Sequence, residues 1–450
     1  MLEKNQCYIT DIIDLTAEGN GVCRIEDIVV FVPATAVGDK IKVKIVKVLK
    51  NYAFGIIDEL ISASPDRIES DCDVSKKCGG CLFRHVSYEA ECKVKSDIVK
   101  NAFTRLASLN PEFEEFMPCS QTVRYRNKAQ YPLAMIDGKA VCGFYAARSH
   151  RVIPVSDCSL QPAVFSEILN TILEYINKNN LEIYNEETHK GFLRHIYIRK
   201  GEHSDEIMVC FVVRSKCEKL LLSLVSELKE KFEDIKSIVM NINPDKTNVI
   251  LGKQNFMLYG KDTITDVMCG NKIEISPLSF YQVNTVQAEK LYAKALEYAS
   301  PTENSVIADL YCGAGTIGLS MAKYVGKVVG VEIIPEAIKN ARINAKLNSV
   351  TNTEFFCGDA GKVFSQLREN GCCPDIIVID PPRKGCSTET LEIIADAKPS
   401  KIVMISCNPS TAARDAKWLC ENGYTLNKVC GVDMFPRTGH VECVAQFELK

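Results

Sequence analysis

From about residue 275 onward, short apolar runs alternate with segments of helical pattern, and this alternation constrains the fold more than any other feature of the chain. The runs at 305–309, 327–332, 375–380 and 401–406 are almost continuously apolar, and a last run follows at 441–448. Continuous apolar runs are typical of parallel strands covered on both faces, and strand–helix alternation is typical of βαβ units. We therefore expect a doubly wound α/β sheet over residues 271–450.

The first 61 residues follow a different pattern, because apolar residues alternate there with polar or small ones. Period-two alternation interrupted by Gly and Pro predicts short antiparallel strands, which can close into a small OB-type β-barrel over residues 1–61. Lys40, Lys42 and Lys44 would share one strand face, which is consistent either with nucleic-acid binding or with a solvated sheet edge. Residues 62–270 mix helical stretches with strand-like runs and predict an α+β middle domain.

The charge balance excludes a strongly basic chain, since 54 Lys and Arg residues stand against 57 Asp and Glu residues, a formal net charge of −3. Any nucleic-acid contact must therefore come from local patches. No apolar stretch approaches the length of a membrane span, and the amino terminus lacks the basic-then-apolar order of a signal peptide. We expect a soluble, cytoplasmic, monomeric protein with no membrane partner.

A glycine-bearing turn lies where the first strand of the expected sheet should meet its first helix, at Asp309-Leu-Tyr-Cys-Gly-Ala-Gly-Thr-Ile-Gly318. Gly313 and Gly315 would let the backbone approach a ligand closely, and Glu332 at the end of the next strand could accept hydrogen bonds from ribose hydroxyls. A dinucleotide such as NAD favours a three-glycine turn facing its pyrophosphate, whereas this turn is preceded by an acid. S-adenosylmethionine carries a sulfonium and an ammonium and no phosphate, so it is the cofactor that we expect.

Two further loops follow strands of the same sheet, Asp380-Pro-Pro-Arg-Lys-Gly385 after one strand and Ser406-Cys-Asn-Pro-Ser-Thr411 after the next. Open α/β sheets place their binding sites at the carboxyl ends of the parallel strands. Cys407 lies in the second loop, between polar residues and before a proline turn. This position favours a reactive thiol over a buried core residue.

Three of the 21 cysteines, Cys72, Cys78 and Cys81, are closely spaced in a glycine-bearing loop, and Cys158 follows far downstream. Thiols in a cytoplasmic chain are expected to stay reduced, so the clustering predicts a metal site and not a set of disulfides. Structural zinc more often uses two Cys-x-x-Cys pairs, while this arrangement also suits an iron–sulfur cluster. The spacing alone leaves zinc and [4Fe-4S] open.

A basic segment between residues 121 and 151 is a candidate RNA-binding surface, because six Lys or Arg residues stand there against Asp137 alone. Cations contact phosphates, and aromatic rings stack on unpaired bases. A solvated sheet face would explain the composition equally well. The residues concerned are Arg124, Arg126, Lys128, Lys139, Arg148 and Arg151, with Tyr125, Tyr131, Phe144 and Tyr145 between them.

Several ordered motifs together resemble one family, the S-adenosylmethionine-dependent RNA uracil-5-methyltransferases, and in particular its bacterial ribosomal-RNA branch. The resemblance covers most of the chain and implies a TRAM-type OB domain in front of a Rossmann-like methyltransferase sheet. Besides the cysteine set and the glycine turn, the motifs are residues 19–33, Tyr125-Arg-Asn-Lys-Ala-Gln-Tyr131, Leu193-Arg-His-Ile196, Phe280-Tyr-Gln-Val-Asn284, Asp380-Pro-Pro-Arg383, Ser406-Cys-Asn-Pro409 and Gly439-His-Val-Glu442.

The resemblance implies Cys407 as the nucleophile and Glu442 as the base of the reaction. The implied partner is RNA, in the first place 23S ribosomal RNA, with the target uridine in a single-stranded or remodelled loop. Tyr281 and Tyr311 stand where the family often has phenylalanine. The implied cofactor or active-site contacts are Gln282, Tyr311, Glu332 and Asp380, and the implied ligands of a [4Fe-4S] cluster are Cys72, Cys78, Cys81 and Cys158.

Methylation of uracil at C5 requires a nucleophile and a base, which are the roles implied for Cys407 and Glu442. C5 of uracil is a poor nucleophile until a thiolate adds to C6, and a positioned carboxylate must then remove the C5 proton so that the thiolate can leave. A base-amino methyltransferase has a similar Asp-Pro-Pro motif but needs no thiol, so Cys407 and Glu442 argue against it. A tRNA uracil-5-methyltransferase would share the motifs and the chemistry. A non-catalytic RNA-binding iron–sulfur protein would share the cysteine set but would not need the cofactor turn.

Overall fold

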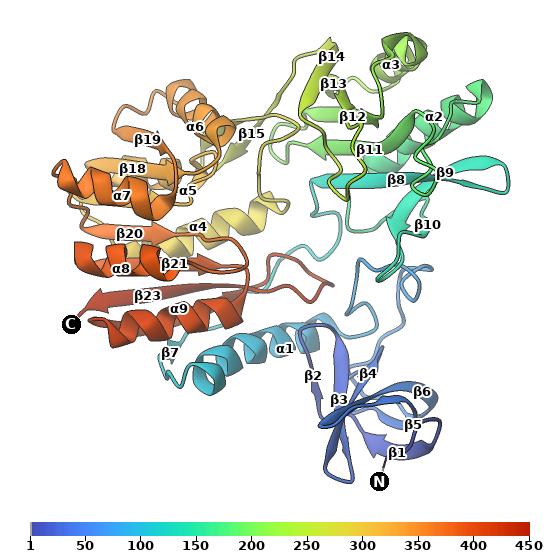
Figure 1. The fold of residues 1–450 in the computed structure, drawn as a ribbon, viewed down its shortest axis with the longest axis horizontal. Coiled ribbons are helices and arrows are strands. Elements are labelled where there is room, and N and C mark those ends of the chain that lie inside the picture. Colours follow the sequence, from blue (N-terminus) through green and yellow to red (C-terminus); the bar gives the residue numbers. More distant parts are fainter. Residues whose placement is uncertain (1) are drawn as a thin grey trace.

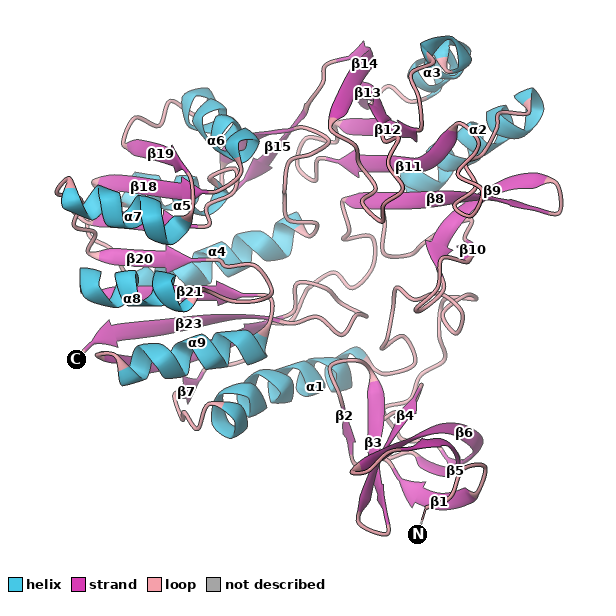
Figure 2. Ribbon diagram, viewed as in Figure 1, coloured by secondary structure: helices cyan, strands magenta, loops and turns pink. Residues whose placement is uncertain are grey.

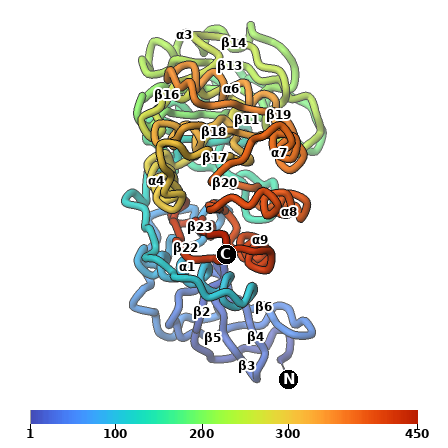
Figure 3. Tube along the Cα trace, turned by 90° about the vertical axis from the view of Figure 1, so that its left-hand side faces the viewer, coloured from blue at the N-terminus to red at the C-terminus, as the bar shows by residue number. Residues whose placement is uncertain are grey.

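The computed structural model describes residues 2–450, which form a small β-barrel, a middle unit and a large α/β unit (Figure 1). In Figure 1 the barrel (blue) lies at the lower right, the middle unit (green) at the upper right and the large unit (yellow to red) at the left. The turned view in Figure 3 places the barrel at the end opposite to the middle unit. Within residues 2–450, no helix is both long and apolar enough to cross a membrane.

Six strands form the barrel: β1 (Cys7–Asp11), β2 (Asp14–Leu15), β3 (Asn20–Ile25), β4 (Ile28–Pro33), β5 (Lys40–Val48) and β6 (Tyr52–Ser62). They are ordered β1-β5-β6-β4-β3-β2. Every second residue of β5 points inward, so that Ile41, Val43 and Ile45 are fully buried and the lysines between them lie on the outer face. On that face, Lys42 pairs with Asp58 at 2.9 Å. The predicted OB-type barrel is confirmed.

Seven strands form the middle sheet: β8 (Lys128–Ile136), β9 (Lys139–Tyr145), β10 (Val152–Pro154), β11 (Leu193–Lys200), β12 (Ile207–Val213), β13 (Ile235–Ile242) and β14 (Gln254–Gly260). Their order is β10-β9-β8-β11-β12-β13-β14, and only the β12–β13 pair of this sheet is parallel. Helices α2 (Ala163–Asn179) and α3 (Leu222–Lys231) cover one face. From the other face, Tyr197 and Met208 enter the core of the large unit, which ties the two units together.

Eight strands form the large sheet: β7 (Glu112–Phe113), β17 (Val306–Leu310), β18 (Lys327–Glu332), β19 (Thr353–Cys357), β20 (Ile376–Ile379), β21 (Lys401–Ser406), β22 (Tyr424–Val432) and β23 (Glu442–Leu449). Their order is β19-β18-β17-β20-β21-β23-β22-β7. The strands from β17 to β21 are parallel, and β23 lies antiparallel between β21 and β22. The predicted α/β methyltransferase-type sheet is confirmed.

Helices cover both faces of the large sheet, as expected for a parallel sheet whose strands are apolar on both sides. In Figure 2, α7 (Ala360–Glu369), α8 (Thr388–Ala397) and α9 (Pro409–Glu421) lie in front of the sheet and α4 (Thr285–Ala299) lies behind it. Helices α5 (Thr316–Met321) and α6 (Pro335–Leu347) share a core with α4. Smaller elements are the hairpin β15 (Ile264–Met268) and β16 (Asn271–Ile275) and the short helices Glu218–Leu220 and Ala322–Tyr324.

Helix α1 (Tyr88–Asn101) precedes the middle sheet in the chain but packs on the large unit. Ser87 caps its amino terminus by accepting a hydrogen bond from the Ala90 N–H at 3.3 Å. The helix continues into a π-helical turn (Ala102–Leu106), and Val99 and Phe103 lie in the same core as residues of α9 and β22. Strand β7 then pairs with β22 in parallel and forms the edge of the large sheet.

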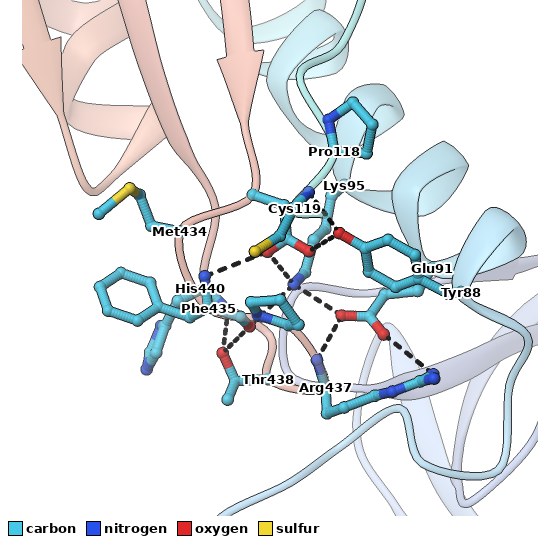
Figure 4. A network of polar contacts seen from close by, with 12 residues as sticks. Tyr88, Glu91, Lys95, Pro118, Cys119, Met434, Phe435, Arg437, Thr438 and His440 are labelled. Atoms are coloured by element: carbon cyan, nitrogen blue, oxygen red, sulfur yellow. Dashed lines mark hydrogen bonds and ion pairs between the residues drawn. The ribbon is translucent and has the colours of Figure 1, made fainter. Parts of the chain in front are cut away.

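The buried side chain of Lys95 in α1 is the centre of a polar network with the loop 433–440 (Figure 4). Its ammonium donates to Glu91 Oε1 at 2.7 Å and to Asp433 Oδ1 at 2.8 Å. The Arg437 backbone N–H donates to the same Glu91 oxygen at 2.6 Å. Because the loop leads directly into β23, helix α1 fixes the direction in which that strand begins.

Replacing Lys95 by Ala should lower the free energy of unfolding by about 3–5 kcal/mol, because two buried carboxyl groups would lose their shared cation. Urea unfolding followed by circular dichroism measures this loss. The matched control is Lys93→Ala, which removes an exposed lysine from the same helix and should change stability by no more than about 0.5 kcal/mol. Equal urea midpoints for the two variants would contradict the conclusion that the Lys95 network stabilises the fold.

Candidate active site

The predicted site residues gather at one edge of the large sheet. Strands β17, β18, β20 and β21 are parallel, so the loops after them meet at this edge. Tyr311 follows β17, Glu332 ends β18, and Asp380 and Cys407 follow β20 and β21. Glu442 reaches the same edge as the first residue of β23, because that strand runs in the opposite direction.

The turn after β17 requires a left-handed backbone, and Tyr311, Gly313 and Gly315 have φ values of 68°, 55° and 77°. A Cβ on Gly315 would lie 3.0 Å from the ring of Phe355, so a side chain there would be crowded as well as strained by the positive φ. A Cβ on Gly313 would meet no atom within 4 Å, which means that this glycine faces open space. The Tyr311 hydroxyl donates to Thr390 Oγ1 at 3.5 Å. The turn therefore exposes its backbone to a ligand at Gly313.

Two acids border this turn. Glu332 accepts hydrogen bonds from the Gly313 N–H at 3.2 Å and from the Ile334 N–H at 2.9 Å. Asp309 is buried, and its Oδ2 accepts from the Gly318 N–H at 2.9 Å while its Oδ1 has no partner. Burial raises the pKa of Asp309 to about 7. An acidic turn with an unpaired buried oxygen fits the cationic S-adenosylmethionine and disfavours a phosphate-bearing cofactor.

Gln282 and Tyr292 line the same edge from the loop before α4 and from α4 itself. Gln282 is 7% exposed. The Tyr292 hydroxyl shares a hydrogen bond with Thr316 Oγ1 at 3.2 Å. Its pKa is raised by burial and by the negative charges of Asp380 and Glu442, so it lies close to both carboxyl groups. The sequence did not reveal Tyr292, because a tyrosine at helical spacing is typical of a core.

Cys407 lies between the end of β21 and the start of α9, where it is partly exposed. Asn408 caps α9 and donates from Nδ2 to the Arg383 carbonyl oxygen at 3.0 Å, which joins the two loops. Burial raises the pKa of the Cys407 thiol, and the negative charges of Glu442 and Asp380 raise it further. Arg383, in contrast, lowers the pKa of the Cys407 thiol through its positive charge.

The two carboxyl groups beside Cys407 hold their protons more tightly than usual. Glu442 is 4% exposed, and burial together with the charge of Asp380 raises its pKa to about 8. Asp380 is partly exposed as a residue, but desolvation of its carboxyl group raises the pKa to about 7. A carboxyl group that titrates near neutral pH can both accept and release a proton. The site therefore combines a thiol with two groups suited to proton transfer.

Arg383 and His440 form a contact that the sequence did not predict, although both residues belong to recognised motifs. Arg383 Nη2 lies 2.6 Å from His440 Nδ1. Burial and the adjacent guanidinium lower the pKa of His440 to about 4, so its neutral ring can accept this hydrogen bond. The family resemblance placed both motifs at one site, but nothing in the sequence shows that these two side chains touch.

The four clustered cysteines are neighbours, but they are not arranged as a metal site. Burial raises the pKa of Cys158 to about 11, and Cys81 and Cys78 are close enough to contribute. Burial also raises the pKa of Cys81, with a contribution from Cys72. Across residues 2–450, however, no group of three His, Cys, Asp or Glu side chains could hold a metal ion. The metal site therefore stays a prediction.

Part of the predicted RNA-binding surface lies in the interior, which corrects the sequence-based expectation. Tyr125 and Tyr131 are 3% and 2% exposed, so their rings cannot stack on RNA bases. The Tyr125 hydroxyl donates to the Pro436 carbonyl oxygen at 3.0 Å. Arg124 is committed to an ion pair with Asp157 at 2.6 Å. Tyr131 is buried because it points inward from strand β8, whereas Tyr125 lies in the loop before that strand and packs against the loop that contains Pro436.

Comparison with known proteins agrees with this geometry. Residues 87–449 match the family model described as tRNA (Uracil-5-)-methyltransferase, and residues 10–57 match the TRAM domain. An uncharacterized RNA methyltransferase of Staphylococcus aureus strain MRSA252 is 42% identical over 451 residues, which cover 100% of this chain and 99% of that protein. A second, from Clostridium tetani strain Massachusetts / E88, is 42% identical over 98% of this chain and 96% of its own length.

A solved structure has the same overall fold. It is the crystal structure of Pyrococcus abyssi tRNA (uracil-54, C5)-methyltransferase in complex with S-adenosyl-L-homocysteine, with a TM-score of 0.78 and 26% sequence identity. The match covers 98% of this chain and 100% of that one. With its carboxyl-terminal four fifths matched by the family model and its barrel by the TRAM model, the chain belongs to the tRNA (uracil-5-)-methyltransferase family of RNA methyltransferases.

Proposed function

We propose that the chain methylates C5 of a uridine in RNA through a covalent bond between Cys407 and C6 of the base, and that Glu442 removes the C5 proton. One observation carries this proposal: a partly exposed thiol lies beside two carboxyl groups of raised pKa at the sheet edge that also bears the glycine turn. A methyltransferase that acted on an amino nitrogen would have no use for the thiol.

Cys407 must lose its proton before it attacks, because the thiolate and not the thiol is the nucleophile. Burial and the two neighbouring acids oppose this ionisation, whereas Arg383 favours it. When the thiolate adds to C6, the electrons of the C5–C6 double bond move toward the carbonyl at C4. C5 then becomes the nucleophile that takes the methyl group.

Glu442 completes the reaction by taking the proton from C5. The electrons of the C5–H bond re-form the C5–C6 double bond, while the bond between C6 and the Cys407 sulfur breaks and the thiolate is released. Because burial raises its pKa to about 8, the ionised Glu442 is a stronger base than an ordinary glutamate. Its fixed position at the start of β23 keeps it beside Cys407 throughout.

S-adenosylmethionine, when bound at the glycine turn, would supply the methyl group as an electrophile on its sulfonium. Glu332 is oriented toward the turn by its bond to the Gly313 N–H and can accept hydrogen bonds from ribose hydroxyls. The unpaired oxygen of the buried Asp309 needs a donor that the described residues do not provide. The residues proposed to contact the cofactor are Gln282, Tyr311, Glu332 and Asp380.

We propose 23S ribosomal RNA as the substrate, on the resemblance of the four-cysteine pattern to the ribosomal branch. Transfer RNA is the second candidate, because the Pyrococcus abyssi enzyme of similar fold is named for uracil-54 of tRNA. We further propose that Cys72, Cys78, Cys81 and Cys158 hold a [4Fe-4S] cluster. The cluster proposal is supported by the proximity of Cys158 to the thiols of the loop 72–81, which lies far away in the chain.

The target is found by mapping 5-methyluridine in RNA from cells with and without the gene. We expect a modified uridine of 23S ribosomal RNA to become unmodified when the gene is absent and to regain its methyl group when the gene is restored. The Cys407→Ala gene serves as the control, because it should not restore the modification. Loss confined to tRNA would make transfer RNA the substrate instead.

Protein purified without oxygen should be brown and contain about four irons and four sulfides per chain if the [4Fe-4S] proposal holds. Cys81→Ala should lose that content while it still binds S-adenosylhomocysteine at the large sheet. Cys92→Ala, which removes a partly buried cysteine outside the set, should keep it. Stoichiometric zinc with no iron in the anaerobic protein would overturn the cluster identity.

RNA that contains 5-fluorouracil should form a denaturation-resistant adduct with the protein in the presence of S-adenosylmethionine, because fluorine at C5 cannot leave as a cation. Cys407→Ala should form none. On ordinary RNA, Glu442→Gln should accumulate the methylated covalent complex and turn over 10²- to 10⁴-fold more slowly, roughly the contribution of one general base. Electrophoresis and single-turnover kinetics measure both effects.

The pH dependence of adduct formation gives a second readout. Since the pKa of Cys407 is raised, the rate should climb with pH through the alkaline range. Glu442 contributes to that increase in pKa, so in Glu442→Gln the climb should begin at lower pH. A normal rate of RNA methylation by Cys407→Ala would refute the nucleophile assignment, and full turnover by Glu442→Gln would refute the base.

A further inference from the structure

Two cations face each other on the side of the middle sheet that is turned toward the large unit, and a third lies in the loop just before them. Lys128 begins β8 and lies directly opposite Arg199 of β11 in the antiparallel register. Arg199 shares this face with Tyr197, which enters the core of the large unit. Arg126 precedes Lys128 by two residues, and Arg126 and Arg199 are both close enough to lower its pKa.

These cations have no anionic partner in the described part of the chain. Among residues 2–450, none of Arg126, Lys128 and Arg199 forms an ion pair, and the Lys128 ammonium has no hydrogen-bond acceptor. The Nε atoms of Arg126 and Arg199 are buried without a partner. Arg199, which is 1% exposed, donates from Nη1 only to the carbonyl oxygens of Ser276 and Ser279, at 3.2 and 3.0 Å.

Such a cluster destabilises the protein on its own. Like charges directly opposite in a sheet repel each other, and a buried cation without a counter-ion loses its hydration. The cost is visible in Lys128, whose pKa is lowered to about 8, first by burial and then by the two arginines. The buried Lys95, by contrast, has Glu91 and Asp433 within 2.8 Å. An uncompensated cluster is expected where a ligand supplies the missing charge.

The cluster borders the candidate active site. Asn127, between two of the cations, donates from Nδ2 to the Gln282 carbonyl oxygen at 2.9 Å. The Arg126 guanidinium lies 6.0 Å from the ring of Phe435, in the loop that leads into β23. Arg126 also contributes to the lowered pKa of His440, the partner of Arg383. A ligand on the cations would therefore lie beside the substrate of the site.

We propose that Arg126 and Lys128, with the buried Arg199 behind them, form a phosphate-binding site that holds one backbone phosphate of the RNA strand next to the target uridine. The inference rests on the proposed RNA substrate. The phosphate would provide the acceptor that the Lys128 ammonium lacks and the negative charge that all three cations lack. A guanidinium can bind a phosphate through two parallel hydrogen bonds, which would fix the direction of the strand as it enters the site.

The carboxylate of the cofactor is the other anion that these cations could bind, and two arguments favour the phosphate. The cofactor turn lies at the ends of β17 and β18, where Asp309 and Glu332 are the nearby charges. In addition, three cations exceed what one carboxylate would require, whereas an RNA strand carries a charge at every nucleotide.

The test compares Lys128→Gln with the unchanged protein in binding to a short single-stranded oligouridine at several salt concentrations. Removal of one phosphate contact should reduce the magnitude of the slope of log K against log [salt] by about 0.7. Affinity at low salt should fall about tenfold. Lys128→Arg should restore both, and Lys178→Gln, an exposed lysine at the end of α2, should leave both unchanged.

Thermal unfolding of the RNA-free protein separates this role from a structural one. Since Lys128 is repelled by both arginines, Lys128→Gln should raise the melting temperature while it weakens RNA binding. An unchanged salt slope, or a lowered melting temperature with unchanged RNA affinity, would overturn the phosphate site. Loss of S-adenosylhomocysteine binding with RNA binding intact would assign the cations to the cofactor instead. If the unchanged protein neither binds nor methylates RNA, the proposed function fails, and the phosphate site fails with it.

Discussion

The register between β21 and β23 is the constraint on which the rest of the site depends. Ser406 lies opposite Cys443 in this antiparallel pair, so one further step along the same register leads to Cys407 and Glu442. A shift by one residue would turn the glutamate to the other face of the sheet. The register is fixed from both sides, because β23 pairs with β21 on one side and with β22 on the other. Ordinary backbone hydrogen bonds thereby bring a thiol and a carboxyl group from separate motifs into one place.

Much of the fold could be predicted because its strongest signals are periodic. Continuous apolar runs predicted the parallel strands, and period-two alternation predicted the barrel. The addition of α1 and β7 to the large unit could not be predicted, because helix α1 has an ordinary amphipathic pattern and β7 spans only Glu112–Phe113. What holds them there is long-range: packing of Phe103 in the core with α9, and the buried charge of Lys95. The residues of α9 and Asp433 lie far away in the chain, so the sequence around α1 and β7 does not indicate these contacts.

Some residues of the candidate site could likewise be predicted from the sequence, and others could not. Residues within motifs, such as Cys407 and the glycine turn, could be located because strand ends carry them to a known edge of the sheet. Tyr292 could not, since it differs from a core tyrosine only in the acids that lie near it. Lys128 is an intermediate case: the sequence placed it in a candidate RNA-binding surface, but only the register with Arg199 reveals two facing cations. Motifs therefore locate the reacting groups, whereas the charges around them depend on tertiary structure.

The ion pair between Lys95 and Asp433 also implies an order in which the parts of the protein can fold. The two residues are 338 positions apart, so the contact cannot form until synthesis has passed Asp433. Domains generally fold in order from the amino terminus, and contacts of such long sequence separation form late. The barrel and the middle sheet can therefore fold while the ribosome is still adding residues. The large sheet must wait for β23, which lies between β21 and β22, so this edge is completed only after Glu442–Leu449 have been added.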